Sequence, residues 1–326
     1  EDFKLKEVNK EKLYMFLREM EFNRLLSSVI STYGEIQFAE TVNKQEKNII
    51  EKKISNKNYI LIDKLDNLKT ILDDVENHGE LCIDTETTSL DPHKADLVGI
   101  SISAKIGYAY YIPIGHKKGN NVVEKDLIKI FKPILEDASI KKIGQNIKFD
   151  FIILYKRGIK MNSMEDTMLM SYVLDAGKNR HNMDTLSKIH LNHSPISYKD
   201  LVGTGKKQIN FSDVEISVAK NYAAEDADIT FRLYKIFSKK LKEEKLYGIY
   251  EIFEKPLIEI LSMMEIKGVK IDQSFLKKLS TKFQKKIEKL EIEIFKLSKK
   301  KFKIGSPKQL GEIMYNDLKI ANTKKT

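Results

Sequence analysis

Cys82-Ile83-Asp84-Thr85-Glu86-Thr87 closes an apolar run with two carboxylates. The β-rich residues before Asp84 predict a strand, and side chains two positions apart on a strand leave the same face of its sheet. Asp84 and Glu86 are therefore expected to point together, and two carboxylates so placed favour a cation between them. A solvated strand edge is the alternative that this segment alone leaves open.

Further β-rich runs and amphipathic stretches surround this segment. Strands are predicted at residues 59–62, 80–83, 97–102, 108–112 and 142–144. Helices with a period of about 3.6 residues are predicted at residues 124–136, 148–157, 164–174 and 213–241. This pattern predicts an α/β domain in which helices flank a mixed sheet.

The two ends of the chain differ from this central part. Residues 1–57 are expected to form a helical lead-in and a lysine-rich linker, whereas residues 245–326 are helical in pattern throughout. The α/β domain is therefore predicted to span residues 58–244. Because residue 1 is not Met and the last residues complete no element, we expect a fragment of a longer protein.

Composition narrows the classes of function. Lys and Arg outnumber Asp and Glu by 57 to 47, and this net charge of +10 suits a nucleic acid, although a lysine-rich coding bias gives the same balance. Cys82 is the single cysteine, which excludes a disulfide framework and a cysteine-based zinc site and favours a reducing cytoplasm. The sequence has no long apolar run, so a membrane partner is not expected.

Two other acidic segments add to the first. Asp150 falls in the first turn of a predicted helix, where the helix dipole favours a carboxylate. Tyr222 and Asp226 stand four residues apart and share one helical face. Each has a purely structural interpretation when taken alone, but three acidic segments together favour a metal site. Asp166 and Asp184, in contrast, precede helical runs and are predicted N-caps.

Residues 84–91, 144–150 and 222–228 resemble the three exonuclease motifs of the DEDDy superfamily, in particular those of the proofreading domain of bacterial family A DNA polymerase I. Residues 180–186 and 198–211 also resemble that domain, and residues 266–272 and 305–310 are similar to the start of the polymerase thumb. The resemblance implies a ribonuclease-H-like fold followed by a truncated, all-helical start of the thumb. It also implies a 3′-5′ exodeoxyribonuclease that releases 5′-mononucleotides from single-stranded or frayed DNA ends.

The resemblance further implies roles for individual residues. It assigns Asp84, Glu86 and Asp226 to one divalent metal ion, and Asp84 with Asp150 to a second. Mg²⁺ or Mn²⁺ is expected, since a hard cation takes carboxylate oxygens and the chain offers no cysteine or suitably spaced histidine set for zinc. Tyr222 matches the tyrosine of the DEDDy motif, and its phenol is expected to orient the attacking water.

Other positions match those that hold the single-stranded 3′ end. They are Leu90, Gln145, Asn146, Phe149 and Tyr198. Phe149 replaces the usual tyrosine and Tyr198 a usual phenylalanine, and core packing is the alternative reading for Leu90 and Tyr198. Four lysines in or beside the motifs are expected to contact phosphates, namely Lys148, Lys199, Lys206 and Lys207.

Two alternatives remain open from the sequence. The same motifs occur in ribonuclease D-like 3′-5′ exoribonucleases, and a catalytically silent DNA-binding or spacer module would keep the fold without the activity. The polymerase and 5′-nuclease catalytic regions are absent from these residues. We therefore expect a monomeric fragment of a bacterial, cytoplasmic, nucleoid-associated polymerase, with the rest of that polymerase as its partner.

Overall fold

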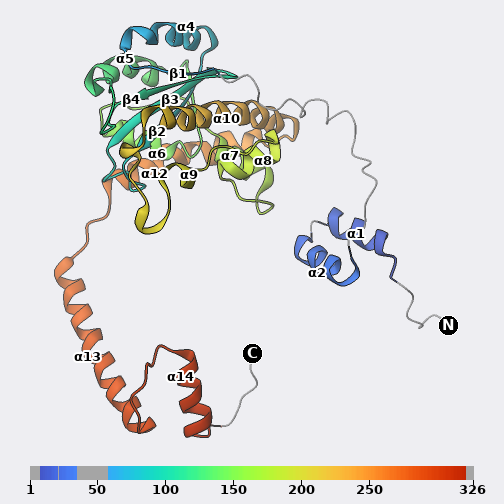
Figure 1. Ribbon diagram of the computed structural model, residues 1–326, viewed down its shortest axis with the longest axis vertical. Helices are drawn as coiled ribbons and strands as arrows, with labels where there is room; N and C mark the ends of the chain where they lie inside the picture. Colours follow the sequence, from blue (N-terminus) through green and yellow to red (C-terminus); the bar gives the residue numbers. More distant parts are fainter. Residues whose placement is uncertain (1–7, 21, 35–57, 321–326) are drawn as a thin grey trace. The chain divides into compact units, whose positions relative to one another are not determined.

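Six strands form one mixed sheet in the computed structural model, which describes residues 8–20, 22–34 and 58–320 (Figure 1). The strands are β1 (Asn58–Leu61), β2 (Glu80–Thr87), β3 (Leu97–Lys105), β4 (Tyr108–Pro113), β5 (Lys141–Gly144) and β6 (Met164–Asp166). Their order is β1-β4-β3-β2-β5-β6. Strands β2, β3 and β4 pair antiparallel, whereas β1 is parallel to β4, and β5 is parallel to β2 and β6. The sequence-based prediction of a mixed sheet is confirmed.

Strand β6 is the element that the sequence analysis assigned wrongly, as part of a helix over 164–174. Residues 164–166 instead pair with β5, where Met164 lies opposite Lys142 and Asp166 opposite Gly144. Asp166 then caps α7 (Thr167–Asp175), accepting hydrogen bonds from the backbone N–H groups of Met168 and Leu169. The predicted capping role of Asp166 is confirmed, and the helix begins only after it.

Helices cover both faces of the sheet. Figure 1 shows α4 (Lys69–His78) and α5 (Glu124–Glu136) on one side of the sheet, and α10 (Ile216–Glu243), α7 and α8 (Met183–Leu191) on the other. The remaining short elements of this domain are α6 (Lys148–Tyr155), α9 (Tyr198–Val202) and the 3₁₀ turns η1 (Leu65–Leu68), η2 (Gly205–Lys207) and η3 (Phe211–Asp213). Asp184 lies inside the first turn of α8, whose N-cap is Asn182, so its predicted capping role was wrong.

Helix α10 runs against five of the six strands and fixes one face of the sheet. Four alanines on its buried side, Ala219, Ala223, Ala224 and Ala227, leave room for the backbone to approach the sheet closely. They pack with Tyr111 and Val98 in one cluster and with Cys82 and Ile143 in another. This close packing brings Asp226 of α10 to the face of β2 that carries Asp84 and Glu86.

The described chain divides into two compact units, residues 1–262 and 263–326. In the first, α1 (Lys10–Glu19) and α2 (Asn23–Tyr33) lie where the helical lead-in was expected, and residues 45–57 of the predicted linker lie outside the described residues. Beyond α10 follow α11 (Tyr247–Ile249), the π-helical turn η4 (Tyr250–Glu254) and α12 (Lys255–Lys267). The second unit contains α13 (Gln273–Ser298), α14 (Pro307–Gly311) and the π-helical turn η5 (Glu312–Asp317). None of the helices in the described ranges has the length and apolar character needed to cross a membrane.

Candidate active site

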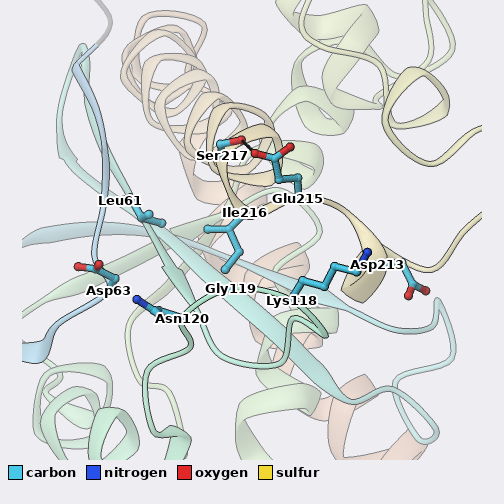
Figure 2. A pocket seen from close by; sticks show the side chains of 9 residues that line it. All are labelled: Leu61, Asp63, Lys118, Gly119, Asn120, Asp213, Glu215, Ile216 and Ser217. Atoms are coloured by element: carbon cyan, nitrogen blue, oxygen red, sulfur yellow. Dashed lines mark hydrogen bonds between the residues drawn. The ribbon is translucent and has the colours of Figure 1, made fainter.

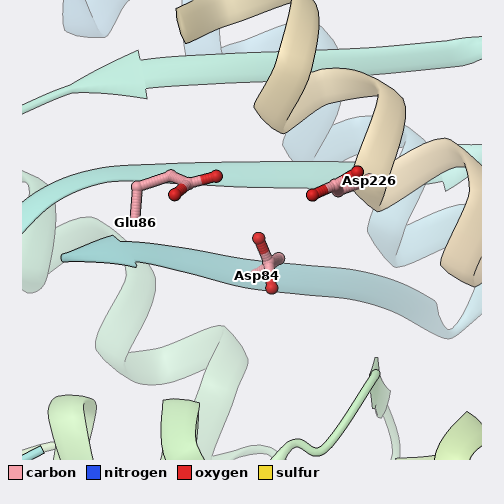
Figure 3. Close-up of side chains that lie close together, drawn as sticks. All are labelled: Asp84, Glu86 and Asp226. Carbon is pink, nitrogen blue, oxygen red and sulfur yellow. The ribbon is translucent and has the colours of Figure 1, made fainter. Parts of the chain in front are cut away.

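Three carboxylates meet where β2 passes beneath α10 (Figure 3). Asp84 and Glu86 leave the same face of β2, and Asp226 comes down from α10. One oxygen atom from each of the three lies within 4.8 Å of the others. Glu86 and Asp226 are buried and Asp84 is partly buried, so like charges are held together away from bulk water.

The electrostatics of this cluster favour a cation. Oxygen Oε1 of Glu86 and Oδ1 of Asp226 are buried and have no hydrogen-bond partner among the described residues. Burial raises the pKa of Asp84 to about 6, and burial together with the charges of Asp84 and Asp226 raises the pKa of Glu86 well above its usual range. A buried, unpartnered carboxylate is costly, and a divalent cation bound by these hard oxygen donors would remove that cost. The residues present therefore fit a divalent metal ion.

Asp150 lies beside this cluster and is bound differently. It stands in the first turn of α6, and its Oδ1 atom accepts hydrogen bonds from the backbone N–H (2.9 Å) and the hydroxyl group (2.5 Å) of Thr85. Burial and the neighbouring charge of Asp84 raise the pKa of Asp150. The structure thus brings three of the four predicted metal ligands together and ties the fourth to the residue between Asp84 and Glu86.

Tyr222 lies one helical turn before Asp226 on α10. Burial, followed by the charges of Asp226 and Glu86, raises the pKa of Tyr222, so its phenol stays protonated at neutral pH. Its ring lies 6.0 Å from that of Tyr198 and 6.1 Å from that of Phe211, centroid to centroid. The rings of Tyr198 and Phe211 are nearly parallel, with their centroids 6.3 Å apart. Tyr198, Phe211 and Tyr222 therefore form an aromatic cluster next to the carboxylates.

A cavity of about 420 Å³ opens above the carboxylates. It is lined by Asp84, Thr85, Glu86, Thr87, Ser89, Leu90, Gln145, Asn146, Phe149, Asp150, Met183, Tyr198, Tyr222 and Asp226. Leu90 has 93% of its surface exposed, which rules out core packing as its role, and Tyr198 is 39% exposed. All five residues expected to hold a strand end thus border the same cavity as the acidic cluster.

Asp166 is hydrogen-bonded to the backbone of the turn between β5 and α6. Its two carboxylate oxygens accept hydrogen bonds from the backbone N–H groups of Asn146 (3.1 Å) and Ile147 (3.0 Å). Asn146 adopts a left-handed φ of 59°, a conformation that asparagine tolerates better than most residues. The side-chain amide of Gln145 donates to the carbonyl of His181 at 2.8 Å. Asp166 thus fixes the backbone of the Gln145–Asn146 turn as well as capping α7.

Three of the four predicted phosphate-binding lysines can be placed relative to this cavity. Lys148 is partly buried, Lys199 and Lys207 are exposed, and none of the three lines the cavity. The side chain of Lys206 lies outside the described part of the structure. Contact between these lysines and phosphates stays a prediction.

Glu225 has a structural role whose partners the sequence did not reveal. It is buried, and its carboxylate accepts hydrogen bonds from the backbone N–H of Ile196 (2.7 Å) and from Nε2 of His193 (3.0 Å). These bonds fix the loop that leads into α9, whose first residue is Tyr198. One sequence signal was available. Glu225 directly precedes Asp226, and adjacent residues of a helix point in different directions, so Glu225 was not expected to share the face that carries Asp226.

A second cavity, of about 460 Å³, lies near the N-terminus of α10 (Figure 2). Its lining residues are Leu61, Asp63, Lys118, Gly119, Asn120, Asp213, Glu215, Ile216 and Ser217. Glu215 accepts a hydrogen bond from the Ser217 hydroxyl at 2.6 Å. The cavity shares no residue with the acidic cluster, and we assign it no catalytic role.

Comparisons with known structures support the fold. The POL domain of Pol1 from M. smegmatis, in complex with DNA primer-template and dNTP, superposes with a TM-score of 0.64 at 20% identity, covering 82% of this chain and 42% of that one. Brucella melitensis NrnC superposes with a TM-score of 0.50 at 24% identity, covering 65% of this chain and 94% of that one. At such identities the likeness concerns the fold, and it confirms the ribonuclease-H-like architecture.

Sequence comparisons identify the family. DNA polymerase I of Rhizobium leguminosarum is 40% identical over 82% of this chain and 28% of its own length, and that of Pseudomonas aeruginosa is 34% identical over 98% and 35%. The chain thus spans about a third of the length of these relatives. A family model described as "3′-5′ exonuclease" matches residues 59–242, which contain the acidic cluster and its cavity. The chain belongs to this 3′-5′ exonuclease family, the exonuclease domain found in DNA polymerase I.

Proposed function

We propose that this chain is the proofreading 3′-5′ exodeoxyribonuclease part of a DNA polymerase I, and that it removes 5′-mononucleotides from single-stranded or frayed 3′ ends. The observation that carries the proposal is the cluster of Asp84, Glu86 and Asp226 at the cavity, with buried oxygens that lack partners. The family match over residues 59–242 supports the same reaction.

Two divalent cations, Mg²⁺ or Mn²⁺, complete this site in the proposal. Asp84, Glu86 and Asp226 would hold one ion, and Asp84 with Asp150 the other. Two such cations, when bound, would supply an activated water and would neutralise charge on the leaving oxygen. The two hydrogen bonds from Thr85 fix the carboxylate of Asp150. Asp150 would therefore need no change of side-chain conformation to bind an ion.

Tyr222 orients the attacking water through its hydroxyl group. Because its pKa is raised, the phenol acts as a hydrogen-bonding group rather than as a base. Replacement by phenylalanine should slow single-turnover hydrolysis and leave metal binding intact. An unchanged rate in Tyr222→Phe would remove the residue from the mechanism.

The rest of the cavity grips the strand end without reading its bases. Leu90 and Tyr198 pack against terminal bases, and Gln145, Asn146 and Phe149 contact the last nucleotides. Base stacking on an aromatic ring is worth about 1–3 kcal/mol and tolerates any sequence. A mismatched terminus then enters more readily than a paired one, because it costs less to unpair.

The lysines beside the motifs would add attraction to phosphates. Lys148, Lys199, Lys206 and Lys207 contribute to binding that weakens with salt, since each phosphate contact releases counterions. A salt titration of single-strand affinity tests this. In the Lys206→Ala/Lys207→Ala double variant, the logarithm of affinity should fall less steeply with the logarithm of salt concentration than in the wild type. Identical slopes would refute the assignment.

The chain's organisation follows the same proposal. Residues 1–57 lead into the exonuclease domain of residues 58–244, and residues 245–326 begin the polymerase thumb. The parent protein would be a bacterial, cytoplasmic polymerase associated with the nucleoid through DNA, and this part of it would be monomeric. Polymerisation belongs to the parent, because the catalytic regions for it lie outside these residues.

Degradation of matched single strands tests the function. The chain should convert a 5′-labelled DNA strand to mononucleotides with Mg²⁺ or Mn²⁺, should be inhibited by EDTA, and should lose activity in Asp84→Ala and Asp226→Ala. Faster degradation of the RNA strand of the same sequence would favour a ribonuclease D-like enzyme. A failure to degrade either strand would favour a silent module.

A further inference from the structure

Ser101 is a fully buried residue on β3 whose hydroxyl has no hydrogen-bond partner among the described residues. In the antiparallel pairing of β2 with β3 it lies directly opposite Asp84. Side chains directly opposite on such a pair leave the same face, with Cβ atoms about 4.5–5.5 Å apart. The Ser101 hydroxyl therefore lies on the face that carries the acidic cluster.

Two neighbouring hydroxyl groups on this face have hydrogen-bond partners, unlike that of Ser101. Ser103, two residues further along β3, donates to the carbonyl oxygen of Tyr108 at 2.8 Å. Tyr111, opposite Ser101 on β4, forms a hydrogen bond with Nε2 of His116 at 2.7 Å. A buried hydroxyl left without a partner costs about 1–3 kcal/mol. Ser101 thus carries this cost in the structure described.

The acidic cluster offers the complementary group. Asp84 is the carboxylate of this cluster that the strand register places opposite Ser101. Beside it, Glu86 Oε1 and Asp226 Oδ1 are buried acceptors that lack a partner among the described residues. Residues that hydrogen-bond to metal ligands fix the orientation of those ligands and raise metal affinity.

We propose that Ser101 is a positioning residue of the metal centre, whose hydroxyl donates a hydrogen bond, directly or through one water, to the carboxylate of Asp84 when that carboxylate holds a divalent cation. This inference rests on the proposed function, since it requires the cluster to bind a divalent ion. Ser101 acts through Asp84 and does not itself contact DNA or metal. It holds the shared ligand of the two proposed ions in one orientation.

Mn²⁺ titration of Ser101→Ala and of a matched control tests this role. The control is Ser103→Ala, a change of the same size on the same strand and face, which breaks a satisfied hydrogen bond. Mn²⁺ affinity is measured by calorimetry or by the electron paramagnetic resonance of free Mn²⁺, and thermal unfolding is measured in EDTA. Ser101→Ala should bind Mn²⁺ about tenfold more weakly, with a Tm in EDTA equal to or above that of the wild type. Ser103→Ala should show a lower Tm and unchanged Mn²⁺ affinity.

The other outcomes separate this inference from the proposed function. If the wild type binds Mn²⁺ and Ser101→Ala binds it within twofold, Ser101 has no role in the metal centre. A fall in Tm in EDTA for Ser101→Ala, as for Ser103→Ala, would show that the hydroxyl is already satisfied in the metal-free fold and would likewise overturn the inference. If the wild type itself fails to bind Mn²⁺, the metal centre is wrong and the inference falls with it.

Discussion

Thr85 donates two hydrogen bonds to one oxygen of Asp150, from its backbone N–H at 2.9 Å and from its hydroxyl at 2.5 Å. Thr85 stands between Asp84 and Glu86 on β2, and its side chain leaves the opposite face of the strand. The pair therefore joins α6 to β2 at the point where β2 presents its two carboxylates. This link is the direct structural connection between the first two acidic segments.

Loss of the Thr85 hydroxyl should disturb both stability and hydrolysis. Thr85→Val keeps the size of the side chain and leaves Asp150 with the backbone donor alone, which should destabilise the fold by about 1–3 kcal/mol. Hydrolysis should slow because Asp150 loses its fixed orientation. Urea unfolding and single-turnover kinetics measure the two effects, and Thr85→Ser, which keeps the hydroxyl, should retain the wild-type rate. A fully active Thr85→Val would contradict the link.

Metal-free stability should fall as pH rises through the range in which the buried carboxylates ionise. The pKa of Asp84 is about 6 in the folded chain, against about 4 in an unfolded one. Because the folded state binds the proton more tightly, stability is highest below pH 4 for this group and is lost between about pH 4 and 6. The raised pKa values of Glu86 and Asp226 extend the loss to higher pH.

Comparison with Asp226→Asn isolates this effect from the rest of the protein. In EDTA the variant should be more stable toward urea than the wild type by about 1–3 kcal/mol at pH 7.5, and this difference should shrink as the pH falls toward about 4. Mn²⁺ should stabilise the wild type at pH 7.5 and have a weaker effect on the variant. If the unfolding free energies of the two proteins in EDTA change with pH in parallel, repulsion among the buried carboxylates does not destabilise the fold.

Gly99 should not tolerate a side chain. It lies opposite Glu86 on β3, and a Cβ atom there would stand 2.2 Å from the hydroxyl oxygen of Tyr111. Tyr111 is fully buried and hydrogen-bonded to His116, so it cannot move away cheaply. Gly99→Ala should therefore destabilise the fold by about 1–3 kcal/mol and lower exonuclease activity, as measured by thermal unfolding and nucleotide release. Gly248→Ala, where a Cβ meets nothing within 4 Å, is the control and should unfold like the wild type.

Much of the fold was predictable because most elements carry their own periodic pattern. The helix predicted over residues 124–136 agrees with α5, and the strand predicted over 108–112 agrees with β4 to within a residue. Strand β6 was not predictable, because its three residues form a strand only by pairing with β5. Local patterns cannot report a conformation that a distant partner imposes.

The acidic segments could be found from the sequence, but their spatial relations could not. Spacing indicated that Asp84 and Glu86 share a face, whereas the bond between Thr85 and Asp150 joins residues 65 positions apart. Ser101 had no signal at all, since a serine in an apolar strand is ordinary until its unpartnered hydroxyl and its position opposite Asp84 are known. Such contacts depend on strand register, which the sequence does not state.

Leu90 offers the clearest separation of binding from stability. It borders the active-site cavity with 93% of its surface exposed, so its truncation removes almost no packing within the folded protein. If it packs against a terminal base, Leu90→Ala should cost about 1–2 kcal/mol of binding, or about five- to thirtyfold in KM for a single strand. The Tm should not change. Leu297→Ala, at a 73% exposed leucine of α13, is the control and should leave both KM and Tm at their wild-type values. Equal KM values for the two variants would exclude a contact between Leu90 and the DNA.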